Sequence, residues 1–433
     1  MRRLGLILAL IAGPALAQDF TTLKGHGGPI MGIAVSPDGQ VATASFDNSV
    51  GLWNRRTPTW LDGHEAAVVT VSYLTKDVVL SGGDDFTLRL WDGPDSAVVV
   101  RHKGKITDVA VGPDGQTVAT ASWDGEIGIW LIIPSGGTQK WNVIGKRFSD
   151  HDGGVNAVAF SSDGKRLYSA SSDGTIRLWT DGGNASRILA SNGFPVNQLI
   201  VDPAGQWVAY GAVDGVTRLI DGDTGAQIAD FTLERRPILA MAYHAETSQL
   251  AVGDGEGYIM MIDPNTRRIT RDFRATRRGP VWALAFSPDG KIIYAGGLDD
   301  VAYAWPVASL DEFDPAIDGQ RTFLRDAASM PNGERQFMRK CSICHALEPG
   351  PSRKAGPTLH GVFGRRAGAV EGYRYSSTLD GSDIIWSDDT IDALFDEGPD
   401  HYIPGSKMPM QVIAKAQDRT DLIAFLKRVT TGE

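Results

Sequence analysis

The chain has 433 residues, of which 52 are acidic and 42 are basic, so its formal net charge is −10. This balance lacks the excess of Lys and Arg that binding to a phosphate backbone requires, which argues against nucleic acid as the main partner. The length predicts two or three domains, and the 51 glycines favour an architecture rich in turns.

The first 17 residues have the pattern of a secretory signal peptide. Arg2 and Arg3 precede a short apolar run, LGLILALIAGPALA, that ends in small residues. We therefore expect cleavage before Gln18, export to the periplasm and a net charge of −12 after cleavage. The apolar run is shorter than the roughly 20 residues of a membrane span, and no later segment approaches that length, so we expect no membrane span in the mature protein. A retained membrane anchor is the alternative.

Residues 18–308 consist of a repeated block. Seven blocks end 38 to 49 residues apart, at Trp53, Trp91, Trp130, Trp179, Ile220, Ile262 and Trp305. Each block alternates apolar and polar residues between turns, which predicts strands joined by hairpins. The period is that of a propeller blade. Blocks such as GHGGPIMGIAVSPDGQVATASFDNSVGLWN and DHDGGVNAVAFSSDGKRLYSASSDGTIRLWT resemble WD repeats, and the resemblance implies an all-β seven-bladed propeller.

The two ends of the repeat region predict how the ring closes. The last block lacks an outer strand after Trp305, whereas DFTTLKGH stands as a spare strand before the first block. Pairing of the first strand with the last block would remove the open sheet edges.

Polar residues recur at fixed places in the blocks. His26, His64 and His151 match the Gly-His position of WD repeats. The resemblance implies that they bond to Ser/Thr and Trp side chains and to a turn aspartate, and so pin each blade. The predicted aspartates are Asp47, Asp85, Asp124, Asp173, Asp214 and Asp299. Blocks five and six lack both the His and the terminal Trp, and His102 and His244 have no blade position in this scheme.

Basic residues gather at the starts of three blocks. Arg235, Arg236, Arg277 and Arg278 precede the first strands of blades six and seven at equivalent places, and Arg101, His102 and Lys103 precede blade three. Equivalent loops lie on one face of a propeller, so these cations predict a site for an anionic ligand or a partner protein. The alternative is a set of solvated arginines on the rim.

Residues 309–331 hold few apolar side chains and follow neither the strand nor the helix period, which predicts a linker. As a flexible coil it would span roughly 26 Å.

Every cysteine of the chain lies in the motif CSICH, which contains Cys341, Cys344 and His345. Two cysteines at this spacing could form a local redox disulfide. The Cys-x-x-Cys-His pattern is, however, typical of covalent attachment of c-type haem, in which the thiols bond to the vinyl groups and the histidine binds the iron.

A second iron ligand is expected downstream. In YIPGSKMPM a Pro-Gly turn precedes Met408, and a His/Met pair gives a closed iron suited to electron transfer. Spacing leaves Met410, His360 and His401 as other candidates, and ordinary apolar packing is the alternative role for Met408.

From Asn332 to the end the chain resembles the class I cytochromes c of the mitochondrial and bacterial soluble type. The matching segments are GERQFMRKCSICH, AGPTLHGVFGRRAG, GYRYSSTL, IIWSDD, YIPGSKM and DLIAFLKRV. The resemblance implies an all-α domain over 332–433 that carries one haem c, with Cys341 and Cys344 as thioether positions and His345 and Met408 as axial ligands.

The same resemblance assigns further roles. Pro357 would offer its carbonyl to the second ring nitrogen of His345. Arg365, Tyr375 and Trp386 match positions around a buried haem propionate, and Gly333, Phe337 and Phe425 match the contact between the first and last helices.

The chain also departs from that family. Where the family has a Tyr in the helix before the Met loop, TIDALFDEGPDHY offers Leu394 or Phe395. A missing hydroxyl there would change the polarity around the Met sulfur.

Three functions follow from these patterns. The first is a periplasmic electron carrier without catalytic residues, in which the propeller docks a periplasmic or membrane-bound redox protein. The second is an enzyme, a reductase or dehydrogenase, that uses the haem as electron entrance or exit. A second cofactor would identify it. The third is an assembly or redox-sensing factor, which would form a stoichiometric complex without electron flow.

Overall fold

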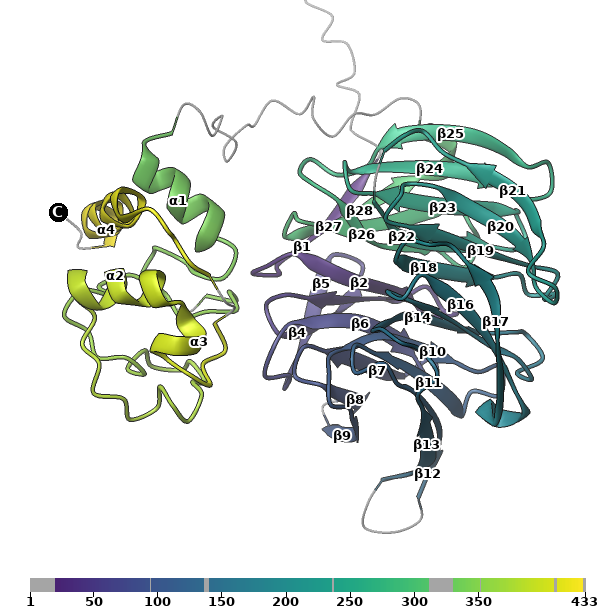
Figure 1. Cartoon of the computed structure of the whole chain (residues 1–433), viewed down its shortest axis with the longest axis horizontal. Helices are drawn as coiled ribbons and strands as arrows, with labels where there is room; N and C mark the ends of the chain where they lie inside the picture. Colours follow the sequence, from purple (N-terminus) through teal and green to yellow (C-terminus); the bar gives the residue numbers. More distant parts are fainter. Residues whose placement is uncertain are drawn as a thin grey trace, which may run out of the picture.

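The computed structural model describes residues 20–93, 95–135, 140–235, 237–310, 330–350, 352–408 and 411–430. They form seven four-stranded antiparallel sheets in a ring, followed by a small helical domain (Figure 1). The predicted fold class, a seven-bladed propeller followed by an all-α domain, is confirmed. The predicted signal peptide and most of the predicted linker lie outside the described residues. Among those described, no helix combines the length and apolarity that crossing a bilayer demands.

The blades follow one another along the chain, each with its first strand at the centre of the ring. Blade 1 contains β2 (Ile30–Val35), β3 (Val41–Ser45), β4 (Ser49–Asn54) and β5 (Thr57–Asp62). Blade 2 contains β6 (Val68–Tyr73), β7 (Val78–Gly83), β8 (Thr87–Asp92) and β9 (Asp95–Arg101). Blade 3 contains β10 (Ile106–Val111), β11 (Thr117–Ser122), β12 (Ile127–Pro134) and β13 (Trp141–Phe148). Blade 4 contains β14 (Val155–Phe160), β15 (Leu167–Ser171), β16 (Thr175–Thr180) and β17 (Ala185–Ser191), with the short 3-10 turn η1 (Asp181–Gly183).

The remaining blades repeat this order. Blade 5 contains β18 (Val196–Val201), β19 (Trp207–Ala212), β20 (Thr217–Asp221) and β21 (Gln227–Phe231). Blade 6 contains β22 (Ile238–His244), β23 (Gln249–Asp254), β24 (Tyr258–Asp263) and β25 (Arg268–Arg274). Blade 7 contains β26 (Val281–Phe286), β27 (Ile292–Gly297), β28 (Val301–Pro306) and, as its outer strand, β1 (Thr21–Lys24); the 3-10 turn η2 (Val307–Ser309) follows.

The ring closes by the first strand of the chain, as the sequence predicts. Strand β1 pairs antiparallel with β28, with Thr21 opposite Ala304. The ring of Phe20 stacks on Trp305 with 4.4 Å between centroids. Pairing of β1 removes the free edge that β28 would otherwise expose to other chains.

Small residues let neighbouring blades approach each other near the centre. A Cβ on Gly211 would lie 2.2 Å from the Ile238 side chain of the next blade, and one on Gly296 would lie 2.5 Å from Ile30. Gly82 and Gly253 receive an inner-strand side chain in the same way. The glycines of the second strands therefore serve the packing of the ring, in addition to its turns.

In blades 1 to 4 one buried set of side chains joins the loop before the first strand to the second and third strands of the blade. In blade 1, His26 bonds through Nδ1 to Asp47 at 2.9 Å and through Nε2 to Thr43 at 2.7 Å. Trp53 donates its indole N–H to the Thr43 hydroxyl at 2.8 Å. His64 and His151 head the same set in blades 2 and 4. These contacts give the three histidines the structural role that the sequence predicts.

His102, left without a blade position in the sequence analysis, heads this set in blade 3. Its Nδ1 lies 3.0 Å from Asp124, and its Nε2 lies 2.8 Å from Thr120. Asp124 and Glu126 also offer oxygens near it, in a group that could hold a metal ion. Both ring nitrogens of His102 are already engaged, so packing explains this group without a metal.

In blades 5 to 7, other side chains take the place of the histidine as partners of the turn aspartate. In blade 6, Arg235 bonds through Nε to Asp254 at 2.5 Å, so an arginine and an unpredicted aspartate take the places of the pair. In blade 5, Arg218 pairs with Asp214 at 2.8 Å. In blade 7, Asp299 accepts a hydrogen bond from the Tyr303 hydroxyl at 2.9 Å. Each turn aspartate keeps a partner although the partner changes.

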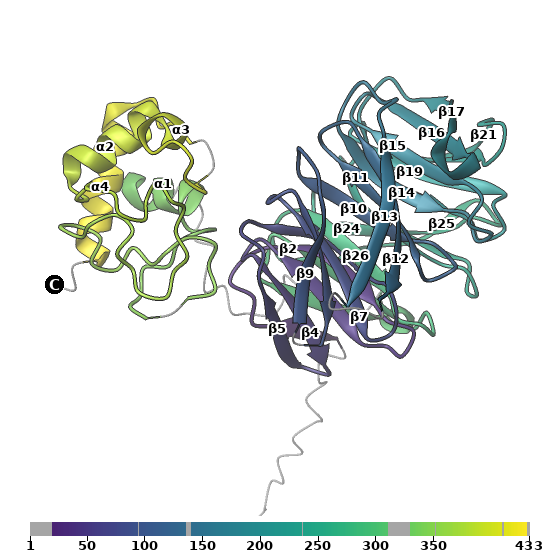
Figure 2. The same ribbon diagram turned by 90° about the horizontal axis from the view of Figure 1, so that it is seen from below.

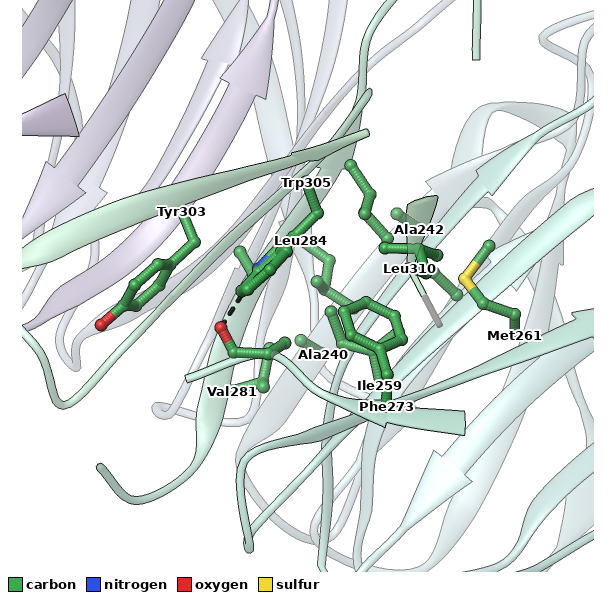
Figure 3. Packing of buried hydrophobic residues seen from close by; sticks show 14 of the residues in the cluster. Ala240, Ala242, Ile259, Met261, Phe273, Val281, Leu284, Tyr303, Trp305 and Leu310 are labelled. Carbon is green, nitrogen blue, oxygen red and sulfur yellow. Dashed lines mark hydrogen bonds between the residues drawn. The ribbon is translucent and has the colours of Figure 1, made fainter. Parts of the chain in front are cut away.

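The seam between blades 6 and 7 is held by the largest apolar cluster of the ring. Figure 3 shows Trp305 among Leu284, Phe273 and Leu310. The indole N–H of Trp305 donates to the Ala275 carbonyl at 3.1 Å, so the buried ring has its polar group satisfied.

The helical domain contains α1 (Asn332–Lys340), α2 (Asp388–Glu397), α3 (Pro399–Tyr402) and α4 (Ala416–Thr430). As expected, α1 crosses α4 through Phe337 and Phe425, whose ring centroids lie 5.5 Å apart. A Cβ on Gly333 would lie 2.0 Å from the Asp421 carbonyl oxygen, so only glycine allows this crossing. Figures 1 and 2 both place the domain beside blade 1 of the propeller.

Candidate functional site

A cavity of about 600 Å³ lies within the helical domain and opens toward the propeller. Its volume falls in the range of roughly 300–1,000 Å³ that is usual for small-molecule and cofactor sites. All eight residues expected to bind the cofactor line it: Cys341, Cys344, His345, Pro357, Arg365, Tyr375, Trp386 and Met408. They come from five separate segments of the chain, so the fold gathers residues that the sequence spreads over 68 positions.

The two cysteines lie on one turn that continues from α1. The Cys341 N–H donates to the Phe337 carbonyl at 2.8 Å, and the Cys344 N–H donates to the Cys341 carbonyl at 3.0 Å. A separation of three residues on such a turn puts both thiols on the same side. The two thiols are free.

Burial favours the protonated form of both thiols. It raises the pKa of Cys341 to about 12 and also raises that of Cys344. A redox disulfide motif needs a lowered thiol pKa, because the thiolate is the reactive form. The environment therefore opposes the redox interpretation of the pair, and it leaves two thiols facing a largely apolar cavity.

His345 is held in one orientation. Its Nδ1 donates to the Pro357 carbonyl at 2.8 Å, which leaves Nε2 as the nitrogen free to bind a metal. Burial holds the pKa of His345 below its usual value, so the ring is neutral, as ligation requires. Gly356 makes room for the ring, because a Cβ there would lie 2.4 Å from Cε1 of His345.

Arg365 is fixed by backbone contacts at the cavity wall. It donates to the carbonyls of His360 at 2.7 Å and Thr358 at 2.8 Å. The Tyr375 hydroxyl accepts from the Val370 N–H at 3.2 Å. A guanidinium and a phenol held in this way can receive a carboxylate such as a haem propionate.

The sequence analysis did not identify three further polar residues of the cavity. Tyr373 donates its hydroxyl to the Ala355 carbonyl at 2.6 Å, and its ring packs against Tyr375. Ser376 Oγ and Gln411 Oε1 are buried and have no hydrogen-bond partner among the described residues. Buried polar atoms usually have partners, so these two fit a cavity that receives a group with polar substituents.

The candidates for the second ligand differ in their positions. Met408 lines the cavity from the loop between α3 and α4. His360 does not line it, and the His401 side chain is 71% exposed, beside Asp400. Met410 lies outside the described residues. Leu394 and Phe395 both reach the cavity from α2, so the helix contributes no hydroxyl there.

Comparison with known proteins agrees with both parts of the structure. The family described as "WD domain, G-beta repeat" matches residues 18–54, 56–92, 95–130, 142–180 and 268–305, and the family "Cytochrome c" matches 331–430. Cytochrome c of Gibberella zeae is 45% identical over 98 residues, which is 23% of this chain and 92% of the relative. Cytochrome c of Arabidopsis thaliana is 44% identical over 98 residues, 23% of this chain and 87% of the relative.

The chain belongs to the cytochrome c family. Its cytochrome c domain binds haem c, and the chemistry of such a domain is electron transfer. The WD-repeat propeller in front of it is of a kind that serves protein interaction. The stretch 181–267 has no match to this family; it contains blade 5 and the first three strands of blade 6, where arginine pairs replace the histidine set.

The basic loops of the propeller are partly used within their own blades. Arg235 pairs with Asp254 and Asp272 and covers the Tyr258 ring at 4.4 Å. Arg278 lies 3.4 Å from Asp299. Arg236 lies outside the described residues. The contacts of Arg235 therefore stabilise blade 6, and this structural role accounts for the residue better than ligand binding does.

Proposed function

We propose that this protein is an exported electron carrier with one covalently attached haem c. The single Cys-x-x-Cys-His motif supports one haem, with His345 and Met408 as its axial ligands. The observation that carries the proposal is the convergence of all eight expected residues on one cavity, with Nε2 of His345 left free by the Pro357 bond. When bound, such a haem supplies one-electron transfer through a closed iron.

The residues of the chain have separate tasks in this proposal. Cys341 and Cys344 anchor the group, Pro357 fixes the ring of His345, and Arg365 with Tyr375 holds a carboxylate. The apolar wall from α2 keeps water away from the cavity. Each of these residues anchors, orients or covers the haem in this proposal, and that division of roles is the one that an electron carrier needs.

Met408 can be tested by a substitution that keeps volume and removes ligation. In the holoprotein, Met408→Leu should lower the reduction potential and change the absorption spectrum, because Met ligation raises the potential. Met338→Leu, which changes a partly buried methionine of the same core, should leave both unchanged. An unchanged potential in Met408→Leu would contradict this ligation. Intact mass should show one haem, and amino-terminal sequencing of exported protein should begin at Gln18.

We further propose that the propeller docks a periplasmic or membrane-bound redox protein. The docked partner is then held close to the haem of the same chain, which raises its effective concentration there. The test uses the full chain with Cys341→Ser and Cys344→Ser, which carries no covalent haem but keeps the propeller. An excess of this variant should slow oxidation of the reduced holoprotein by periplasmic and membrane fractions. No slowing at saturating excess would contradict docking by the propeller.

A further inference from the structure

One loop of the cytochrome c domain reaches the propeller at blade 1. The guanidinium of Arg353 lies over the ring of Trp60, 4.1 Å from its centroid, and donates to Asp62 at 2.6 Å. Its Nε lies 4.0 Å from Asp47. The Arg353 side chain is 32% exposed, so two propeller carboxylates and an indole cover most of it.

The backbone of the two domains meets at the same place. A Cβ on Gly27 would lie 2.2 Å from the carbonyl carbon of Arg353 and 2.6 Å from the amide nitrogen of Lys354. Gly27 donates its N–H to Asp47 at 2.8 Å, and Asp47 belongs to the buried set that pins blade 1. The loop therefore sits on a rigid part of the propeller and needs a glycine below it.

Charges extend this contact to the neighbouring blades. Burial holds the pKa of Lys354 below its usual value, while the carboxylate of Asp300 in blade 7 acts in the opposite direction. In blade 2, burial lowers the pKa of Arg89 and the like charge of Arg374 lowers it further, so this pair opposes the contact. The attraction across the contact therefore comes from three propeller carboxylates, Asp47, Asp62 and Asp300, which face the cations of the Arg353–Lys354 loop.

The same contact covers the open side of the haem cavity. Propeller residues from the turns of blades 1 and 2 complete the cavity lining: Phe46, Asn48, Glu65, Asp84, Asp85 and Phe86. All come from loops at one end of the strands, between β3 and β4, β5 and β6, and β7 and β8. The edge of a haem in this cavity would face these loops and not a protein partner.

We propose that the loop face of blades 1 and 2 is a docking site for the cytochrome c domain of the same chain, and that this docking closes the haem edge. Exchange of electrons with a protein partner then requires release of the contact around Arg353, whereas a small reductant reaches the closed form. The proposal uses the haem site described above and is independent of the identity of any external partner. Because much of the contact is ionic, raising the salt concentration should favour release.

The first test measures shape and needs no electron transfer. Solution X-ray scattering of the full-length holoprotein should show a larger maximum dimension for Arg353→Glu than for wild type at low salt. Wild type should approach the variant at high salt. Lys415→Glu makes the same charge change at an exposed residue that does not line the cavity, and it should match wild type. The charge exchange Arg353→Glu with Asp62→Arg should restore the smaller dimension.

The second test measures access to the haem. Reduction by a reduced blue-copper protein should be about five- to tenfold faster in Arg353→Glu than in Lys415→Glu, the size of effect expected from losing one partly buried cation–π and ionic contact. Reduction by ascorbate should be the same in both. Equal scattering of wild type and Arg353→Glu at every salt concentration would overturn the docking, and equal rates with the copper protein would overturn the closing of the haem edge. Failure of haem attachment would instead count against the proposed function.

Discussion

Nδ1 of His345 lies 2.8 Å from the carbonyl oxygen of Pro357, and Gly356 lies directly against the same ring. One dipeptide therefore sets both the tautomer of the histidine and the space in which it sits. Ligand orientation in metal sites commonly depends on such a neighbour.

Gly356→Ala should disturb this arrangement. The added Cβ would lie 2.4 Å from Cε1 of His345, so the ring or the loop must move. Overpacking of this kind costs about 1–3 kcal/mol of unfolding free energy, and the displaced ring should also change the reduction potential. Thermal unfolding and potentiometry of the holoprotein measure the two effects.

Gly361→Ala is the matched control for that substitution. Gly361 has a positive φ of 61° and no atom near its Cβ position. Alanine there should cost about 1 kcal/mol through backbone strain and leave the potential unchanged. A Gly356→Ala protein with wild-type potential and stability would show that the loop does not constrain His345.

His102 provides the second prediction. Substitution His102→Gln should lower the unfolding free energy of the propeller by about 1–3 kcal/mol, since Asp124 and Thr120 would lose buried partners. The haem spectrum should stay the same. His244→Gln, at a half-buried ring that bonds to Thr247 and to the Pro288 carbonyl, should cost less, about 0.5 kcal/mol. Denaturant unfolding followed by tryptophan fluorescence distinguishes the two, and an equal effect would contradict the structural role of His102.

The sequence predicted most of the propeller because each blade repeats a local pattern. The strand period, the turn residues and the spare strand before the first block require no knowledge of distant contacts. His102 was missed although a signal existed: it precedes Asp124 by 22 residues and Trp130 by 28, the spacings of His151 to Asp173 and Trp179. The spacing to Asp and Trp therefore identifies the blade histidine better than a Gly-His pair does.

Other parts of the structure left no such signal. Arg235 takes the histidine place in blade 6, but its distance of 19 residues to Asp254 differs from that of the other blades. The eight cavity residues followed from the family resemblance, whereas Gly356, Ser376 and Gln411 emerge only from the packing. The contact of Arg353 with Trp60 joins positions 293 residues apart, and no local pattern encodes it.

Removal of β1 gives the third prediction. A chain that begins at Gly25 lacks Thr21–Lys24 and the Phe20 ring that stacks on Trp305. Strand β28 would then expose a free edge, which promotes pairing with other chains. Size-exclusion chromatography should show oligomers or aggregates for this chain. A chain that begins at Gln18 should remain in the wild-type state, and a wild-type profile for both would argue that β1 is dispensable for closure.

The fourth prediction concerns pH. Burial holds the pKa values of His102 and His151 below their usual value in the folded protein, despite the carboxylates of Asp124 and Asp173 beside them. The unfolded chain therefore binds protons first as the pH falls below about 6.5, and the unfolding free energy decreases from that point. Above that pH these two histidines contribute their full stability.

The aspartates of the same sets act at lower pH. Burial alone would raise the pKa values of Asp124 and Asp173, but hydrogen bonds and the neighbouring histidines hold them below the usual range. Their contribution is lost only as the pH falls below about 4. Denaturant unfolding between pH 8 and pH 5 should thus show a plateau above about pH 7 and a decline below about pH 6.5. The double variant His102→Gln with His151→Gln should show a shallower decline, and an unchanged slope would place the acid sensitivity elsewhere in the chain.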